Sequence, residues 1–423
     1  MTMDAWIAAA VFVVAYVLIA IDRWDRTLIA LLGGMLMIVL GVIDQQQAFA
    51  AIDLNVIFLL AGMMVIASVV AKTGFFELLA IRSVRLSHGH PMRLLLILAA
   101  VTAIVSAFLD NVTTVVLMTP IIFSVARRLE ISPMPYLLAS VFASNIGGTA
   151  TLIGDPPNIL IGSAAGLGFG DFLFNLAPVI VVVFLAFAGV MWLSFRGSLK
   201  VPDERREAAL EGAEGTAIKN RPLLYRALAI AGLTILGFLF HSVLGLEVAT
   251  IALLGAAALM LVAHLDVAET LREIEWPTLF FFVGLFILVD GIVATGIVGR
   301  FADALAEATK GDAALAAIAL LWFSGFVSAI VDNIPYTATA IPVVHRLVDS
   351  GMHTNALWWA LSLGACLGGN LTIIGASANV VVANMADRAG TPIRFAQFLR
   401  YGAAVFASSL VISTVYLWVR YFA

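Results

Sequence analysis

Residues 106–122 read SAFLDNVTTVVLMTPII and place an Asp-Asn pair inside a long apolar stretch. Residues 328–344 read SAIVDNIPYTATAIPVV and repeat the opening Ser-Ala-x-x-Asp-Asn, with a proline at the same distance after it. A carboxylate at the centre of a bilayer costs roughly 2.5–3.5 kcal/mol on insertion scales, so it persists only where it faces water or a binding site. The two stretches therefore indicate a functional site to which both halves of the chain contribute.

The composition is that of an integral membrane protein. Of 423 residues, 62% are hydrophobic and 12% are charged, and the mean hydropathy is +1.06, whereas soluble domains carry roughly 25% charged residues. The alternating pattern of a β-barrel is absent, so we predict an all-α membrane protein. Apolar runs long enough to cross a bilayer, about 17–25 residues, lie near 5–21, 27–43, 55–71, 172–195, 224–240, 247–264, 277–295 and 396–419.

The two halves of the chain resemble each other. A shift of 222 residues aligns the two Asp-Asn pairs, and a shift of 221 residues aligns GGTATLIGDPPN at 147–158 with GGNLTIIGASAN at 368–379. These matches include polar residues in the same order across several segments, which chance similarity between apolar sequences does not explain. We predict a first repeat at 1–195, a hydrophilic linker at 196–222 and a second repeat at 223–423.

Each repeat is predicted to contain five transmembrane helices, a re-entrant hairpin and a broken helix. The hairpins would be 92–129 and 313–347, each turning at its Asp-Asn pair, and the broken helices 135–164 and 355–386, each interrupted by its Gly-rich segment. An odd number of crossings inverts the second repeat relative to the first. Inverted repeats with broken helices are typical of secondary transporters, which bind their solute at the repeat interface.

Lys and Arg are distributed unevenly across the predicted loops. With the N-terminus outside, all but four of the 23 basic residues lie on the inner side, and the four exceptions are Arg300, Lys310, Arg346 and Arg420. The positive-inside rule therefore predicts that both termini lie outside and that the 196–222 linker is cytoplasmic. We expect a multi-pass protein of the inner (plasma) membrane.

The candidate site residues are polar side chains at the hairpin turns and helix breaks. Asp110, Asp332 and Asp155 are the candidates for proton coupling, because burial of a carboxyl group raises its pKa and lets it exchange protons near neutral pH. The candidates for solute binding are the amides and hydroxyls of Asn111, Thr149, Thr151, Asn158, Asn333, Asn370, Thr372 and Asn379. Structural roles compete with these, since Asp is a favoured N-cap and Asn forms interhelical hydrogen bonds.

The motifs resemble those of the ion transporter superfamily. DNVTTVVLMTPI at 110–121, followed by SNIGGTATLIGDPPNIL at 144–160, is similar to the signature of the branch that groups ArsB-type arsenite efflux permeases, NhaD-type sodium/proton antiporters and the melanosomal P protein. The resemblance covers essentially the whole chain, and within this branch an ArsB-type permease is the expected member. It implies a scaffold that often dimerises and a transport domain that moves as an elevator. In related dicarboxylate symporters the hairpin tips carry Ser-Asn-Thr. In this chain Asp110 and Asp332 stand where those serines would be, which argues against a dicarboxylate solute.

The charge of the candidate site limits the solute. No Lys or Arg lies in a predicted midplane segment, so a cation, a proton or a neutral polar solute fits better than an anion. Trivalent arsenic and antimony are mainly neutral trihydroxides near pH 7, and the single cysteine, Cys366, excludes a three-thiolate site. We expect arsenite or antimonite export in exchange for protons. Sodium/proton exchange is the first alternative, and small-anion transport of the P-protein type is the second.

Other protein classes fit the sequence less well. A channel has no use for two alternating hairpin sites, and a membrane enzyme would need a nucleophile with a base or a His/Glu metal cluster, of which the sequence has no recognisable spacing. We therefore expect no enzymatic activity, no metal site, no cofactor and no nucleic acid partner. Transport would depend on the proton motive force, with sodium as the alternative coupling ion. A homodimer and an ATPase subunit are partners that the sequence leaves open.

Overall fold

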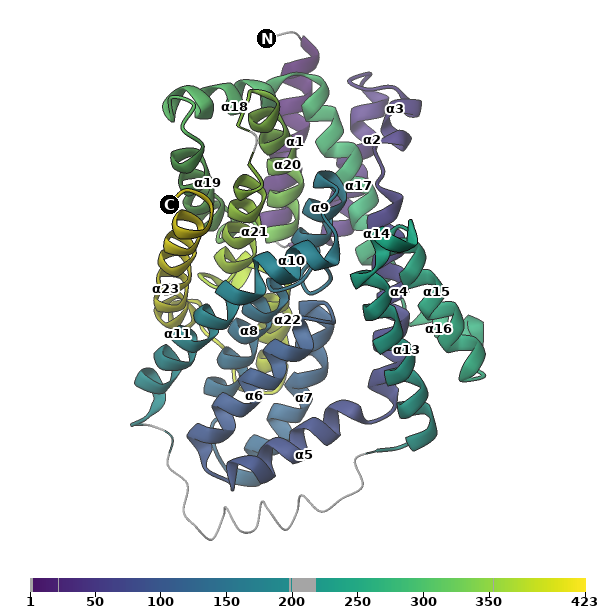
Figure 1. The fold of residues 1–423 in the computed structure, drawn as a ribbon, viewed down its shortest axis with the longest axis vertical. Helices are drawn as coiled ribbons and strands as arrows, with labels where there is room; N and C mark the ends of the chain where they lie inside the picture. Colours follow the sequence, from purple (N-terminus) through teal and green to yellow (C-terminus); the bar gives the residue numbers. More distant parts are fainter. Residues whose placement is uncertain (1–2, 22, 198, 200–217, 353) are drawn as a thin grey trace.

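The structure is a computed structural model, and it describes residues 3–21, 23–197, 199, 218–352 and 354–423. The described part is almost entirely helical, as predicted (Figure 1). Seven of its helices are long and apolar enough to cross a membrane: α1 (Met3–Ile21), α4 (Leu54–Lys72), α7 (Asn111–Leu129), α11 (Ala177–Phe195), α13 (Arg221–Leu239), α17 (Trp276–Ala294) and α23 (Phe395–Tyr421). The predicted crossings at 27–43 and 247–264 contain the shorter helices α2 (Arg26–Val39) and α15 (Val248–Val262).

Acidic residues determine where several helices begin. Asp25 accepts hydrogen bonds from the first backbone N–H groups of α2, and Asp53 does the same for α4. Asp312 caps α19 (Ala313–Ser328) in the same way. These carboxylates satisfy N–H groups that have no partner within the helix. The caps explain why charged residues border apolar helices in the sequence.

Glycine contacts hold helices of the two halves together. A Cβ atom added at Gly62 in α4 would lie 2.7 Å from the backbone of Ala252 in α15, and one at Gly284 in α17 would lie 2.5 Å from the backbone of Ala30 in α2. Small residues let helix backbones approach closely in a membrane. Gly62 and Gly284 occupy corresponding positions in the two halves. The packing of α4 on α15 therefore corresponds to the packing of α17 on α2.

Two helical hairpins contain the Asp-Asn pairs. The first consists of α6 (Pro91–Ser106) and α7, joined by residues 107–110, and the second of α19 and α20 (Asn333–Asp349), joined by residues 329–332. Ser106 Oγ donates to the Ser144 carbonyl at 2.8 Å, and Ser328 Oγ donates to the Ala365 carbonyl at 2.6 Å. The same hydrogen bond therefore fixes each hairpin against the helix that follows it.

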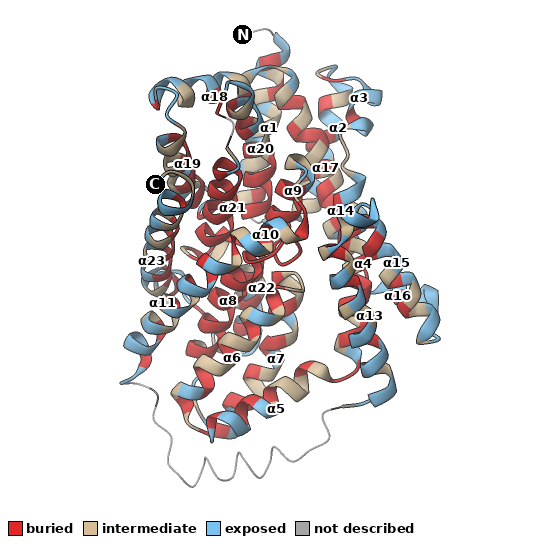
Figure 2. Ribbon diagram, viewed as in Figure 1, coloured by how far each residue is buried: buried red, intermediate tan, exposed pale blue. Residues whose placement is uncertain are grey.

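Each hairpin is followed by two helices with a non-helical interval between them. These pairs are α8 (Met134–Gly148) with α9 (Pro156–Ala165), and α21 (Ala356–Gly368) with α22 (Ser377–Arg388). A short 3-10 turn at Ile373–Gly375 lies in the second interval. Every residue of α21 and nearly every residue of α8 is buried, so these helices form the centre of the protein (Figure 2).

The remaining helices are short or amphipathic connectors. Most of the predicted linker at 196–222 lies outside the described residues, and α13 begins at Arg221. The helices α5 (Phe75–Ser87) and α18 (Ile297–Ala308) correspond to each other, and each precedes a hairpin (Figure 1). The connectors are α3 (Gln45–Ala50), α5 (Phe75–Ser87), α10 (Phe169–Asn175), α14 (His241–Leu244), α16 (Val267–Arg272) and α18 (Ile297–Ala308).

Candidate functional site

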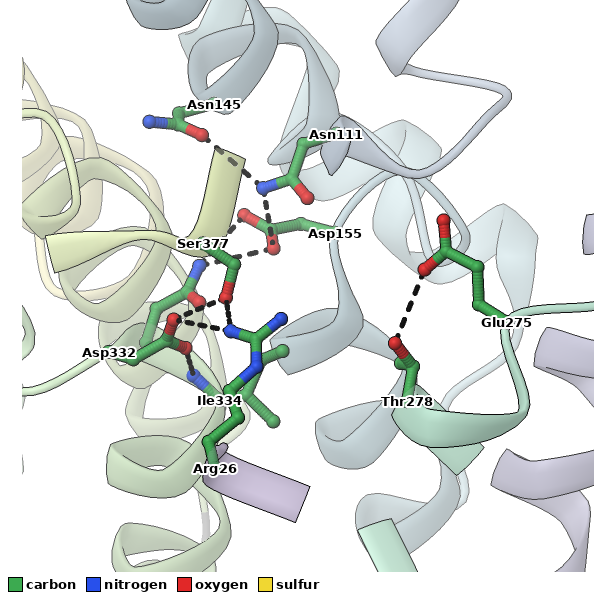
Figure 3. A network of polar contacts seen from close by, with 10 residues as sticks. Arg26, Asn111, Asn145, Asp155, Glu275, Thr278, Asp332, Ile334 and Ser377 are labelled. Carbon is green, nitrogen blue, oxygen red and sulfur yellow. Dashed lines mark hydrogen bonds and ion pairs between the residues drawn. The ribbon is translucent and has the colours of Figure 1, made fainter. Parts of the chain in front are cut away.

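Asp155 lies at the centre of the candidate site, in the interval between α8 and α9. It is fully buried. Its carboxylate accepts a hydrogen bond from Asn111 Nδ2 at 3.2 Å and from Asn333 Nδ2 at 3.1 and 3.3 Å (Figure 3). The ion pairs formed by described residues do not include Asp155. A buried carboxylate held only by neutral donors is costly unless it gains a proton or a cation.

The two asparagines that bind Asp155 come from different hairpins. Asn111 is the first residue of α7 and Asn333 is the first residue of α20, so both hairpin turns meet at this one carboxylate. Residue Ala376 occupies the position of Asp155 in the second half, so the carboxylate has no counterpart there. The site is thus built from both halves but has a single acidic group at its centre.

A chain of amide hydrogen bonds extends from this carboxylate across the two halves. Asn111 Nδ2 also donates to Asn145 Oδ1 at 3.3 Å, and Asn145 Nδ2 donates to Asn370 Oδ1 and Asn379 Oδ1, each at 3.0 Å. All of these side chains are buried. Asn145 was not among the predicted site residues, because its counterpart in the second half is Cys366 and the repeat comparison shows no polar match there.

Two atoms of this amide network have no hydrogen-bond partner among the described residues. They are the acceptor Asn111 Oδ1 and the donor Asn370 Nδ2, and both are buried. Buried polar groups are nearly always hydrogen-bonded, so these two atoms are where the network can take a further partner, either a water molecule or a solute. A hydroxyl group can serve both, because it donates one hydrogen bond and accepts others.

Asn158 and Asn379 hold the backbone of the two helix breaks. Asn158 Nδ2 donates to the carbonyls of Thr149 and Thr151 at 3.1 and 2.8 Å. Asn379 Nδ2 donates to the carbonyls of Gly369 and Thr372 at 2.7 and 2.9 Å. These bonds satisfy carbonyl groups that the interrupted helices leave free, as backbone buried in a membrane protein requires.

The predicted threonines also bond to the backbone. Thr149 Oγ1 donates to the Asn145 carbonyl at 2.7 Å. Thr151 Oγ1 donates to the carbonyl of Ala107, and Thr372 Oγ1 to the corresponding carbonyl of Ala329. The hydroxyls of Thr151 and Thr372 therefore connect each helix break to its hairpin turn, whereas that of Thr149 bonds within its own helix, α8.

Asp110 and Asp332 both cap the second helix of their hairpin. Asp110 Oδ1 accepts from the Thr113 N–H at 2.8 Å, and Asp332 Oδ1 accepts from the Ile334 N–H at 3.1 Å. Asp332 has a second set of contacts that Asp110 lacks in the described part of the chain, because it also pairs with a cation. The two acids are therefore equivalent in the sequence but not in their surroundings.

The cation is Arg26, which lies outside the predicted midplane segments and is not among the predicted site residues. Arg26 is the first residue of α2, and its Nη1 atom lies 3.4 Å from Asp332 Oδ2 (Figure 3). The same nitrogen donates to Ser377 Oγ, which in turn donates to Asp332. Arginine carries its charge at the end of a long side chain, so a residue at the end of a helix reaches the hairpin turn.

Arg26 and its partners border a cavity of about 230 Å³. Its polar wall consists of Arg26, Asp332 and Ser377 together with Asp25, the cap of α2, and Asn384 of α22. The N-termini of α20 and α22 also lie at this wall, and helix N-termini favour negative charge. The wall combines two carboxylates, those of Asp25 and Asp332, with one guanidinium, so a solute here meets charges of both signs.

Paired hairpins and interrupted helices that converge on a buried polar site are an arrangement typical of membrane transporters. The comparison with known families agrees with this class. The sequence profile of the CitMHS family, described as citrate transporters, matches residues 16–364. The chain belongs to the CitMHS citrate transporter family.

Relatives along the full length of the chain are also transporters or membrane proteins. The uncharacterized transporter Rv2684 of Mycobacterium tuberculosis is 46% identical over 98% of both chains. The 46 kDa membrane protein of Mycobacterium leprae is 45% identical, with the same coverage. The human P protein is 32% identical over 98% of this chain and 60% of its own length. The predicted resemblance to the P protein is confirmed, whereas the ArsB type stays a prediction.

A solved structure shows the same fold. The crystal structure of the Alcanivorax borkumensis YdaH transporter aligns with a TM-score of 0.56 at 17% identity, covering 99% of this chain and 97% of that chain. The similarity concerns the fold. Together with the family, it establishes a multi-pass membrane transporter.

Proposed function

We propose that this protein is a proton-coupled secondary transporter that exports a small neutral polar solute across the plasma membrane. The observation that carries the proposal is the buried Asp155 carboxylate, which accepts from Asn111 and Asn333 and has no cationic partner among the described residues. A proton would neutralise this carboxylate, and it would be taken up on one side and released on the other. The solute would move outward as the proton moves inward.

The proposed solute is the neutral trihydroxide of trivalent arsenic or antimony. Its hydroxyl groups match the unpaired acceptor on Asn111 and the unpaired donor on Asn370. A neutral solute also accounts for a site rich in amides, because no fixed charge has to compensate it. The one cysteine, Cys366, donates to Asn158 Oδ1 at 3.6 Å and cannot form a site of several thiolates.

Transport in an arsenite-sensitive bacterial strain tests this proposal. We expect cells that express the protein to accumulate less arsenite and to grow at higher arsenite concentrations, and cells that express Asp155→Asn to lose both effects. Protection against sodium or lithium at high pH, with arsenite accumulation unchanged, would support the sodium/proton alternative instead. The membrane amount of each variant is measured with a C-terminal tag, so that a loss of activity is not mistaken for a loss of protein.

A small carboxylate is the second candidate solute, because Arg26 faces the cavity of about 230 Å³ beside Asp332. A carboxylate could replace Asp332 as the partner of Arg26, since guanidinium groups bind carboxylates well. The description of the family as citrate transporters points in the same direction. Uptake of radiolabelled citrate and succinate into the same cells decides between the two candidates. Saturable carboxylate uptake that Arg26→Gln abolishes would favour the anion.

We further propose that the two halves are inverted repeats that alternate access by an elevator movement, with both termini outside and the linker cytoplasmic. The corresponding hydrogen bonds of Ser106 and Ser328 support two equivalent hairpins. Alkaline phosphatase is active only outside the cytoplasm, so a fusion to Ala423 is expected to be active and a fusion within the 196–222 linker inactive. The opposite pattern would contradict the proposed orientation.

A further inference from the structure

The second hairpin is held by polar contacts from α1 and α2, which precede the hairpins in the chain. At one end, the Arg26 guanidinium contacts both Asp332, the cap of α20, and Ser377, the first residue of α22. The side chain of Arg26 is 32% exposed and that of Asp332 is 14% exposed, so water reaches this contact only in part. Hydrogen bonds between charged groups are stronger than neutral ones under such conditions.

A second contact lies further along the same hairpin helix. The Tyr16 hydroxyl of α1 donates to the Pro335 carbonyl at 2.8 Å and lies 2.6 Å from Thr339 Oγ1. Both partners belong to the first turns of α20. Tyr16 and Arg26 therefore attach α20 to the α1–α2 pair at two separate points.

The first hairpin lacks the residues for equivalent contacts. The positions that correspond to Arg26, Tyr16 and Ser377 hold Val248, Phe238 and Pro156. None of these three side chains can donate a hydrogen bond or carry charge. Asp110 keeps its acid, but among described residues it forms no ion pair. The asymmetry therefore lies in the sequence and would persist in any conformation of the protein.

We propose that Arg26 and Tyr16 are positioning residues that latch the second hairpin, α19–α20, and that the first hairpin, α6–α7, is the free one. The two end states of the transport cycle are then unequal, because only one of them is stabilised by an ion pair between α2 and a hairpin. The first hairpin opens more readily than the second. The solute therefore exchanges more readily on the side of the membrane that the first hairpin faces. The inference rests on the proposed alternating access but not on the identity of the solute.

Hydrogen–deuterium exchange of the purified full-length protein in detergent, without any solute, tests the latch. We expect Arg26→Val to raise the amide exchange rate of 329–336 about tenfold, as the loss of hydrogen bonds between charged groups implies, and to leave 107–114 unchanged. Tyr16→Phe should act on the same segment to a smaller extent. Arg272→Val is the matched control, because Arg272 is exposed and forms no ion pair in the described structure.

Two results would overturn the latch. One is unchanged exchange of 329–336 in Arg26→Val, and the other is an equal rise in both hairpins, which would mean general destabilisation.

The reverse substitution provides a gain of function. Val248 holds the position of Arg26 and Asp110 that of Asp332, so Val248→Arg is expected to slow exchange of 107–114 by pairing with Asp110. Unchanged exchange there would contradict the assignment of the asymmetry to these positions. Because no solute is present, the proposed substrate can fail while the latch stands.

Discussion

Asn111 and Asn333 occupy matching positions in the two hairpins and both donate to the same carboxylate, at 3.2 Å and 3.1 Å from Asp155. Movement of either hairpin away from the centre removes one donor from a buried charge. Leaving a buried charge with fewer partners costs more than an ordinary hydrogen bond contributes. The hydrogen bonding of the carboxylate therefore depends on both hairpins, so the proton proposed for Asp155 would couple their movements.

The first prediction concerns these two donors. Asn111→Ala and Asn333→Ala should each reduce transport at least about tenfold, because each leaves Asp155 with one donor fewer. The double variant should be little worse than either single variant, since residues that share one partner do not act independently. Solute counterflow in proteoliposomes measures the effect. Asn355→Ala is the control, because that side chain is exposed and, in the described structure, makes no capping hydrogen bond at the N-terminus of α21. Losses that add up fully would mean that the two asparagines act at separate sites.

The second prediction separates the two hairpin acids. Asp332 already has a cationic partner in Arg26, whereas Asp110 has none in the described structure. Substitution by Asn preserves both helix caps, because Asn caps as well as Asp. We expect Asp110→Asn to change the pH dependence of transport more than Asp332→Asn does. Initial rates between pH 5.5 and 8.5 measure this, and identical profiles for the two variants would contradict it.

The third prediction concerns Glu275, which precedes the membrane-spanning part of α17. Burial, together with the negative charge of Asp110, raises the pKa of Glu275 above its ordinary value of 4.5. A raised pKa means that the folded state disfavours the ionised form, so stability falls as the pH rises through the pKa of the folded protein. Glu275→Gln removes this penalty. The melting temperature of the variant in detergent should exceed that of the wild type more at pH 8 than at pH 4. A constant difference across this range would be inconsistent with the shift.

The fourth prediction concerns the packing of α8 on α6. A Cβ atom at Gly147 would lie 2.0 Å from the carbonyl oxygen of Ala103, and a backbone atom cannot move aside cheaply. Gly147→Ala should therefore abolish folded protein. Gly189→Ala in α11 is the matched control, since a Cβ there meets nothing within 4 Å. Fluorescence-detected size exclusion compares the two variants. A monodisperse Gly147→Ala protein at wild-type amounts would show that the two helices are not packed this closely.

The sequence predicts much of the fold because its interruptions are chemically distinct. An Asp-Asn pair inside an apolar run marks each hairpin turn, and glycines with prolines mark the first helix break, so the helix boundaries at α7 and α9 follow from local preferences. The lengths of α2 and α15 do not follow, because apolar runs of crossing length contain helices of only 14 and 15 residues.

The site was predicted less completely, for two physical reasons. Asn145 was missed because the repeat comparison selects residues that are polar in both halves, and Cys366 replaces it. Arg26 was missed because its place at the end of an apolar run predicts a side chain in water. Its contact with Asp332 spans 306 residues along the chain and depends on how α2 packs beside the second hairpin. Such a contact follows from tertiary structure and not from local pattern.

The central claim is that Asp155 carries the coupling proton. Proteoliposomes that contain a pH-sensitive dye and purified protein test it most directly, with an arsenite gradient as the only driving force. The wild type should move protons against the arsenite flow, and Asp155→Asn should move none, although it still exchanges labelled arsenite in counterflow. Proton movement by Asp155→Asn at the wild-type rate would contradict the account.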